Sequence, residues 1–301
     1  MALGERPLRT KELTEQVRGY TPRTIYRYAS KLGEAGILER HEEPGVPSKV
    51  THSLTEPKGR ELYELVVAYA NASFIRLPDG RIDAHAWGSL SMLADLWESG
   101  LIEELNLGPK SPTELAQLEH GLSYHQINRR VSLFAIGGFL REEVTPGYRR
   151  TYVLTEQARR GMALIAGLGR WRQQHVGGQA EGGLTVGEVA TVLRASLPLL
   201  QLPEHQERSI KLGIVGATGQ NGQRGSAALT AHVSAGGAVR CVKEKASEDA
   251  WGIGTVDTWF SALLDGERDG MRTGGDVDLL DDCLTSLHET LWAAPAKVGA
   301  R

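Results

Sequence analysis

The chain has 301 residues, of which 41% are hydrophobic and 24% are charged. At roughly 100 to 200 residues per domain, this length predicts two or three separate cores, and the composition excludes a disordered or fibrous protein. No apolar run approaches the roughly 20 residues that span a bilayer, and the first residues lack the apolar core of a signal peptide. We therefore expect a soluble, cytoplasmic protein that has no membrane partner.

A net charge of −3 argues against a nucleic-acid-binding protein when it is averaged over the whole chain, but the charge is unevenly distributed. Residues 1–78 carry 12 Lys and Arg against 10 Asp and Glu, a balance of +2, and residues 79–176 carry 11 of each. Residues 177–301 carry 11 against 16, a balance of −5. The front of the chain therefore permits DNA binding if its basic side chains gather on one face.

The first half of the chain contains an internal repeat. Residues 12–38 match residues 114–140 at a constant offset of 102, with the identical pairs Glu12 and Glu114, Leu13 and Leu115, Gly19 and Gly121, Ile25 and Ile127, Arg27 and Arg129, Gly36 and Gly138, and Leu38 and Leu140. The tripeptide at 54–56 returns at 154–156, so the second copy is two residues shorter in between. Agreement in one register over this length predicts two copies of one fold.

Each copy has the pattern of a winged helix-turn-helix. In the first copy, residues 10–17 predict a short helix, and Thr21 and Pro22 mark the start of a second helix that ends at Gly36. The apolar stripe of this second helix is expected to contain Ile25, Tyr28, Ala29 and Leu32. A β-hairpin with its second strand at 49–54 and a helix near 57–73 follow. The second copy repeats this order, with helices at 112–118 and 123–137, a hairpin with its tip at Pro146-Gly147, and a helix near 156–173.

One short helix of this fold can enter the major groove of double-stranded DNA. We expect donor side chains on its outer face to contact DNA, namely Arg23, Thr24, Arg27 and Lys31 in the first copy and Tyr124, His125, Asn128 and Arg129 in the second. Lys49 in the first hairpin, and Arg149 and Arg150 in the second, are expected beside the phosphate backbone. The alternative is that the winged helices only dimerise or contact another protein.

The stretch LERHEEPGVPSKVTHSLTEPKGREL resembles the wing and following helix of HxlR-type bacterial regulators. The resemblance covers roughly residues 1–175 and is weaker in the second copy, which lacks the Val-Pro element. It implies a dimeric transcription regulator that binds operator DNA, with Arg23, Arg27, Lys31 and Lys49 as positioning or reading residues. The family has a helix before its L-G-x-R element, which corresponds here to residues 3–6. The first copy lacks that helix and is expected to be loose, or completed by another part of the chain or by a partner.

Residues 175–183 have the composition of a flexible linker, and a third domain is predicted at 184–295. The expected elements are an amphipathic helix at 184–200, strands at 211–217, 227–233, 238–242 and 271–275, a helix capped by Thr255 and a last helix that starts at Asp276. This order predicts an α+β domain with an antiparallel sheet.

The segment GTVDTWFSALLDGERDGMRTGGDVDLLDDCLTSL resembles the end of a sterol-carrier-protein-like domain. The resemblance implies a fold that encloses an apolar tunnel for a hydrophobic ligand, and the candidate lining residues are Trp251, Trp259, Phe260 and Leu263. The alternative, that these side chains belong to an ordinary core, stays open at this point.

Other kinds of site are not predicted. The glycines of LGIVGATGQNGQRG follow a predicted strand, but no helix opens at them, so we expect a hairpin connection and no cofactor. The nine histidines are scattered, and Cys241 and Cys283 have no partner at ligand spacing, which predicts no metal site. No nucleophile elbow or phosphate loop is present, so no catalytic residue is predicted.

Together the patterns predict a helix-rich α+β protein with winged helix-turn-helix domains at 1–78 and 79–176 and a sterol-carrier-like α+β domain at 184–295. We expect a homodimeric, bacterial-type DNA-binding transcription regulator that responds to a hydrophobic small molecule through its C-terminal domain. The alternative is an enzyme or carrier for a hydrophobic metabolite that uses its winged helices only to dimerise.

Overall fold

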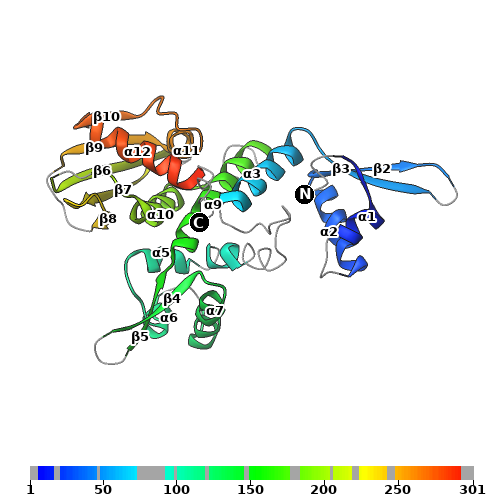
Figure 1. Ribbon diagram of the computed structural model, residues 1–301, viewed down its shortest axis with the longest axis horizontal. Coiled ribbons are helices and arrows are strands. Elements are labelled where there is room, and N and C mark those ends of the chain that lie inside the picture. The colour runs from blue at the N-terminus through cyan, green and yellow to red at the C-terminus, as the bar shows by residue number, and fades with distance from the viewer. Residues whose placement is uncertain are drawn as a thin grey trace, which may run out of the picture.

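The computed structural model describes residues 6–16, 21–45, 48–72, 92–97, 100–118, 122–145, 149–176, 184–203, 206–218, 224–242 and 248–292. Figure 1 shows an N-terminal lobe, a second lobe and a C-terminal domain, which meet at two helices that lie side by side in the middle of the molecule. None of the described helices is long and apolar enough to cross a membrane.

The N-terminal lobe contains three helices and a small sheet: β1 (Leu8–Arg9), α1 (Thr10–Gln16), α2 (Pro22–Glu34), β2 (Leu38–Glu43), β3 (Lys49–Leu54) and α3 (Lys58–Ala72). The sheet has the order β1-β3-β2, and both pairings are antiparallel. Helix α2 begins where the sequence predicts, because the hydroxyl of Thr21 accepts from the backbone N–H of Thr24 at 3.3 Å and Pro22 opens the first turn. Gly36, with φ of 68°, turns the chain into β2.

The second lobe repeats the order of two helices and a hairpin, with further helices before and after them. A helical segment at 92–97 is followed by α5 (Leu101–Asn106), α6 (Pro112–Ala116), α7 (Tyr124–Ile136), β4 (Leu140–Thr145), β5 (Arg149–Leu154), α8 (Glu156–Arg160) and α9 (Met162–His175). Strands β4 and β5 form an antiparallel hairpin. A bridge from Lys110 to Tyr152 takes the place that the pairing of Leu8 with His52 has in the N-terminal lobe.

The same hydrogen bonds close both hairpins onto the preceding helix. Thr55 Oγ1 donates to the carbonyl oxygens of Gly36 and Ile37 at 2.7 and 3.2 Å. Thr155 Oγ1 donates to the carbonyl oxygens of Gly138 and Phe139 at the same two distances. Sequence identity between the repeats is therefore accompanied by identical local geometry at the end of each hairpin.

The C-terminal domain consists of α10 (Val186–Ser196), the 3-10 helix η2 (Leu197–Leu199), β6 (Arg208–Thr218), β7 (Arg224–Val233), β8 (Val239–Val242), β9 (Ala250–Thr255), α11 (Val256–Leu264), β10 (Arg272–Gly275) and α12 (Val277–Trp292). Its sheet has the order β10-β9-β6-β7-β8. The expectation of an antiparallel sheet was wrong, because β9 pairs parallel to β6. After β8 the chain crosses to the far side of β6 and enters β9 in the direction of β6, which makes the sheet mixed.

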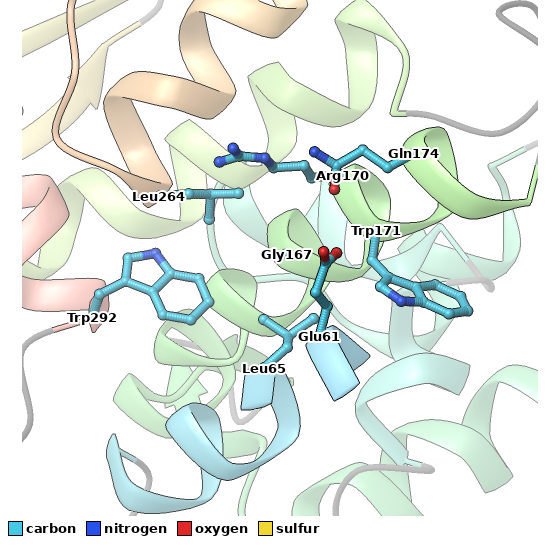
Figure 2. A pocket seen from close by; sticks show the side chains of 8 residues that line it. All are labelled: Glu61, Leu65, Gly167, Arg170, Trp171, Gln174, Leu264 and Trp292. Atoms are coloured by element: carbon cyan, nitrogen blue, oxygen red, sulfur yellow. The ribbon is translucent and has the colours of Figure 1, made fainter. Parts of the chain in front are cut away.

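Helix α3 attaches the N-terminal lobe to α9, as Figure 2 shows around Leu65 and Trp171. The Trp171 indole N–H donates to the carbonyl oxygen of Lys58 at 2.9 Å, and the Lys58 ammonium lies 5.8 Å from the centre of the indole ring. Gly167 permits the close approach, since a Cβ there would lie 2.3 Å from a methyl carbon of Leu65. This docking supplies packing to the N-terminal lobe from outside its own small cluster.

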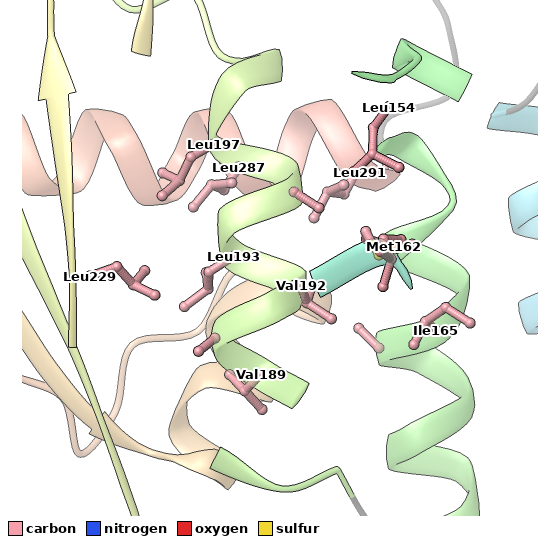
Figure 3. Packing of buried hydrophobic residues seen from close by; sticks show 14 of the residues in the cluster. Leu154, Met162, Ile165, Val189, Val192, Leu193, Leu197, Leu229, Leu287 and Leu291 are labelled. Carbon is pink, nitrogen blue, oxygen red and sulfur yellow. The ribbon is translucent and has the colours of Figure 1, made fainter. Parts of the chain in front are cut away.

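The second lobe and the C-terminal domain share one hydrophobic core, which runs from Leu93 to Leu291 along the chain. Figure 3 shows α10 in its middle, with Val192 directed towards Met162 of α9 and Leu193 towards Leu229 of the sheet. The N-terminal lobe has a separate cluster of Leu8, Leu13 and Ile25. At about 1.5–3 kcal/mol for each fully buried side chain, this small cluster provides little stability by itself.

Two arginines of α8 also join the second lobe to the C-terminal domain. The Arg159 guanidinium donates to the carbonyl oxygen of Ala195 at 3.2 Å, and the Arg160 guanidinium donates to that of Thr290 at 3.1 Å. Burial lowers the pKa of Arg159 from its ordinary value. Residues 175–183 were predicted as a flexible linker. Of these, 177–183 lie outside the described residues, while the cores on either side of the segment are continuous.

We expect acidic pH to destabilise the N-terminal lobe through His52. This side chain is buried, and its Nε2 lies 3.2 Å from Thr10 Oγ1. Burial, and then the nearby Arg40, lower the pKa of His52 below the ordinary 6.5. The unfolded lobe therefore takes up a proton as pH falls below about 6.5 while the folded lobe does not, so the free energy of unfolding decreases by up to about 1.4 kcal/mol per pH unit.

Hydrogen exchange of the β3 amides between pH 7.5 and pH 5.5, corrected for the intrinsic pH dependence of exchange, measures this effect. The control is His52→Tyr, because Tyr152 occupies the equivalent position in the second lobe. The variant should lose most of the dependence on pH, and an unchanged dependence would show that another group is responsible.

Candidate nucleic-acid interface

The outer face of α2 carries three cationic side chains at successive turns. Arg23, Arg27 and Lys31 are spaced by four residues and are exposed, while Ile25 and Ala29 of the same helix are buried. Within the part of the chain that the structure describes, neither Arg23 nor Lys31 forms an ion pair. The Arg27 guanidinium carbon lies 5.3 Å from the centre of the Tyr28 ring. This face therefore presents a row of cations that are available to a polyanion.

Three other side chains of α2 do not lie as the sequence predicts. Tyr28 and Leu32 were expected on the apolar stripe, but they are 50% and 36% exposed, and the buried residues of this helix are Ile25 and Ala29. The Thr24 hydroxyl, expected to face DNA, lies 2.9 Å from the Thr21 hydroxyl at the start of the helix. Thr24 is half-buried there and takes part in the helix cap.

The outer face of helix α7 is less cationic and more apolar than that of α2. Tyr124, His125, Asn128 and Arg129 are all exposed, as the sequence predicts. The position equivalent to Lys31 is Leu133, which is 41% exposed, and the position equivalent to Glu34 is Ile136, which is 82% exposed. Arg130 pairs with Asp95 at 3.5 Å. Helix α7 therefore carries fewer unpaired cations than α2 and more exposed apolar surface.

The two hairpins bring their basic residues next to carboxylates. Lys49 is the direct cross-strand partner of Glu43, and Arg150 pairs with Glu142 at 3.4 Å. Arg149 is opposite Thr145 in the strand register, and its side chain lies outside the described residues. The acidic residues Glu39, Glu42 and Glu43 are visible in the sequence of β2, but only the register shows that Glu43 is the one opposite Lys49. A phosphate contact by Arg150 therefore competes with its exposed ion pair to Glu142.

Three of the four residues expected to line a ligand tunnel lie in the core of the C-terminal domain. Trp259, Phe260 and Leu263 are buried, and the Trp259 indole N–H donates to the carbonyl oxygen of Gly213 at 2.9 Å. Trp251 is half-buried and packs against the backbone of Gly274. A pocket of about 190 Å³ lies elsewhere, between α3, α9, α11 and α12, and none of these four residues lines it. Hydrophobic-ligand binding by the C-terminal domain stays a prediction.

The two cysteines have the properties of core residues. Burial raises the pKa of Cys241 to about 11 and the pKa of the fully buried Cys283 to about 12, so both are protonated thiols at neutral pH. Among the residues that the structure describes, no group of three or more His, Cys, Asp or Glu side chains is placed to hold a metal ion.

Comparison with known proteins assigns the N-terminal lobe. The family model of the HxlR-like helix-turn-helix matches residues 1–73. An uncharacterised HTH-type transcriptional regulator of Halalkalibacterium halodurans is 38% identical over 55 residues, which cover 18% of this chain and 49% of that protein. The match thus spans about half the length of that regulator. No solved structure matches the chain significantly. Residues 1–73 therefore form an HxlR-like helix-turn-helix domain.

Proposed function

We propose that this protein is a DNA-binding transcription regulator of the bacterial type that acts in the cytoplasm. The observation that carries the proposal is the row of Arg23, Arg27 and Lys31 on the exposed face of α2, within the HxlR-like domain. An exposed helix with cations on three successive turns is complementary to the major groove and its flanking phosphates. The relative in Halalkalibacterium halodurans is named as a transcriptional regulator, which is consistent with this function.

The second lobe is proposed to be a second winged helix-turn-helix domain that contacts DNA beside the first. Its support is the repeat in sequence and the matching Thr55 and Thr155 hydrogen bonds. Since α3 docks on α9, one chain holds both candidate recognition helices on a shared scaffold. Docking of the two helices in successive major grooves would require a spacing of about 34–36 Å along the DNA.

Two further properties belong to the proposal. The protein is expected to form a homodimer, and a hydrophobic small molecule is expected to regulate it through the C-terminal domain. Such a molecule can shift the spacing of the DNA-binding lobes only if it binds the two arrangements with different affinity. The continuous core between the second lobe and the C-terminal domain gives a physical route for this coupling.

Selection of binding sites from a random pool of duplex DNA tests the function. The full chain should enrich a defined motif, and the binding of that motif should weaken steeply with salt, because cationic side chains replace the counterions of DNA. Failure to retard any duplex at low salt would overturn the proposal. If the protein retards no duplex but turns over a small molecule, the result would favour an enzyme or carrier.

A further inference from the structure

The pocket between α3, α9, α11 and α12 is built from parts of the chain that lie far apart in the sequence. Leu65 comes from the N-terminal lobe, Trp171 from α9, and Leu264 and Trp292 from the C-terminal domain. Figure 2 shows the two indoles on opposite sides of the pocket, with Leu65 between them and Leu264 beside Trp292. Its volume of about 190 Å³ is below the roughly 300–1,000 Å³ of pockets that hold drug-sized molecules, so an occupant must be small.

The charged side chains of the pocket already have partners. The Glu61 carboxylate lies 2.7 Å from Nε2 of His175, and the Arg170 guanidinium pairs with Asp265. The pocket therefore offers little to attract an ion. Its apolar walls, which include two indole rings, favour a neutral planar molecule that can stack or pack edge-on against them.

One polar group at the rim of the pocket, the side chain of Gln174, is left for an occupant. The indole N–H of Trp292 is buried and has no hydrogen-bond partner within the described residues, whereas that of Trp171 is used by Lys58. The Gln174 side chain is exposed at the rim, and no described residue is its hydrogen-bond partner. The buried Trp292 donor offers no accessible surface to an occupant, so the Gln174 side chain is the group that can form a hydrogen bond with a polar atom of the occupant.

We propose that this pocket binds a small, neutral aromatic compound that carries one hydrogen-bonding group. Helix α3 provides the principal contacts between the described part of the N-terminal lobe and the rest of the molecule, so an occupant lies at the joint that orients α2. Binding of the compound is thereby coupled to the orientation of the N-terminal lobe relative to α9. An effect of the compound on DNA affinity rests in addition on the proposed DNA-binding function.

Fluorine NMR of 4-fluorophenol with the full-length protein tests the site. We expect the resonance of this neutral probe to broaden with added protein, whereas that of the anion 4-fluorobenzoate should broaden at least about tenfold less. Leu264→Trp fills the pocket from α11 and should weaken binding of the phenol by at least about tenfold. Trp251→Phe changes an aromatic residue outside the pocket and should leave the broadening as it is in the unaltered protein.

Three results would overturn the site: no broadening of 4-fluorophenol, equal broadening by both probes, or unchanged binding in Leu264→Trp. If Leu264→Trp misfolds, Gln174→Leu at the exposed rim takes its place and should weaken binding of the phenol severalfold. Coupling is measured as the change in DNA affinity at saturating 4-fluorophenol. An unchanged affinity would refute the coupling, and a protein that binds the phenol but no DNA would refute the proposed function while leaving the site intact.

Discussion

Replacing Arg27 by alanine is expected to weaken binding of the selected DNA motif by about 10- to 100-fold, which corresponds to roughly 1–3 kcal/mol. Arg27 lies in the middle of the cationic row on α2 and is exposed, so its truncation removes a DNA contact and leaves the core of the lobe intact. The slope of log affinity against log salt should become shallower by about one unit if the contact is to a phosphate. Affinity measured at several salt concentrations gives both quantities.

The matched control is Arg272→Ala, which removes the same charge from an exposed site on β10 of the C-terminal domain. It should change affinity far less than Arg27→Ala. On α7, Arg129→Ala should weaken binding by a smaller factor than Arg27→Ala, because the next turn carries Leu133 in place of a lysine. Leu133→Lys should strengthen binding, since the new ammonium would project from an exposed position. Equal affinity of Arg27→Ala and the unaltered protein would show that α2 does not contact DNA.

The sequence predicted best those elements that short-range chemistry determines. The start of α2 follows from Thr21 and Pro22, and the start of α11 from Thr255, whose hydroxyl accepts from the Thr258 N–H at 3.1 Å. The repeat predicted the second set of elements, because it preserves the residues, such as Thr155, that close each hairpin.

Features that depend on distant parts of the chain were not predictable in this way. Strand β9 has the sequence AWGIGT, in which glycines replace the alternating apolar residues that identify a strand, and its pairing partner β6 lies about 40 residues earlier. The exposure of Tyr28 and Leu32 depends on how small the core of the lobe is, which helical periodicity does not report. The pocket on α3 requires Leu65 and Trp292 to meet, and nothing in either local sequence indicates that contact.

Trp171→Ala is expected to release α3 from α9 and to destabilise the N-terminal lobe. The indole is only 9% exposed, and its loss removes apolar contact with α3, the hydrogen bond to the Lys58 carbonyl and the contact with the Lys58 ammonium. Truncation of a buried tryptophan to alanine generally costs about 3–5 kcal/mol. Because the hydrophobic cluster among the described residues of the lobe is small (Leu8, Leu13 and Ile25), a loss of this size exceeds what the lobe can recover by itself.

Hydrogen exchange resolved along the chain distinguishes this effect from general unfolding. The amides of α3 and β3 should lose protection in Trp171→Ala, while those of β6 and β7, in the core of the C-terminal domain, should keep theirs. Trp251→Ala removes a half-buried indole from β9, where it packs against Gly274 of β10, and should leave α3 protected. DNA binding gives a second readout. In Trp171→Ala the two lobes are no longer held on one scaffold, so the affinity for a DNA motif that contacts both lobes should fall. It should approach the affinity for a half-motif that contacts one lobe alone. Unchanged protection of α3 would mean that the N-terminal lobe is held by other contacts.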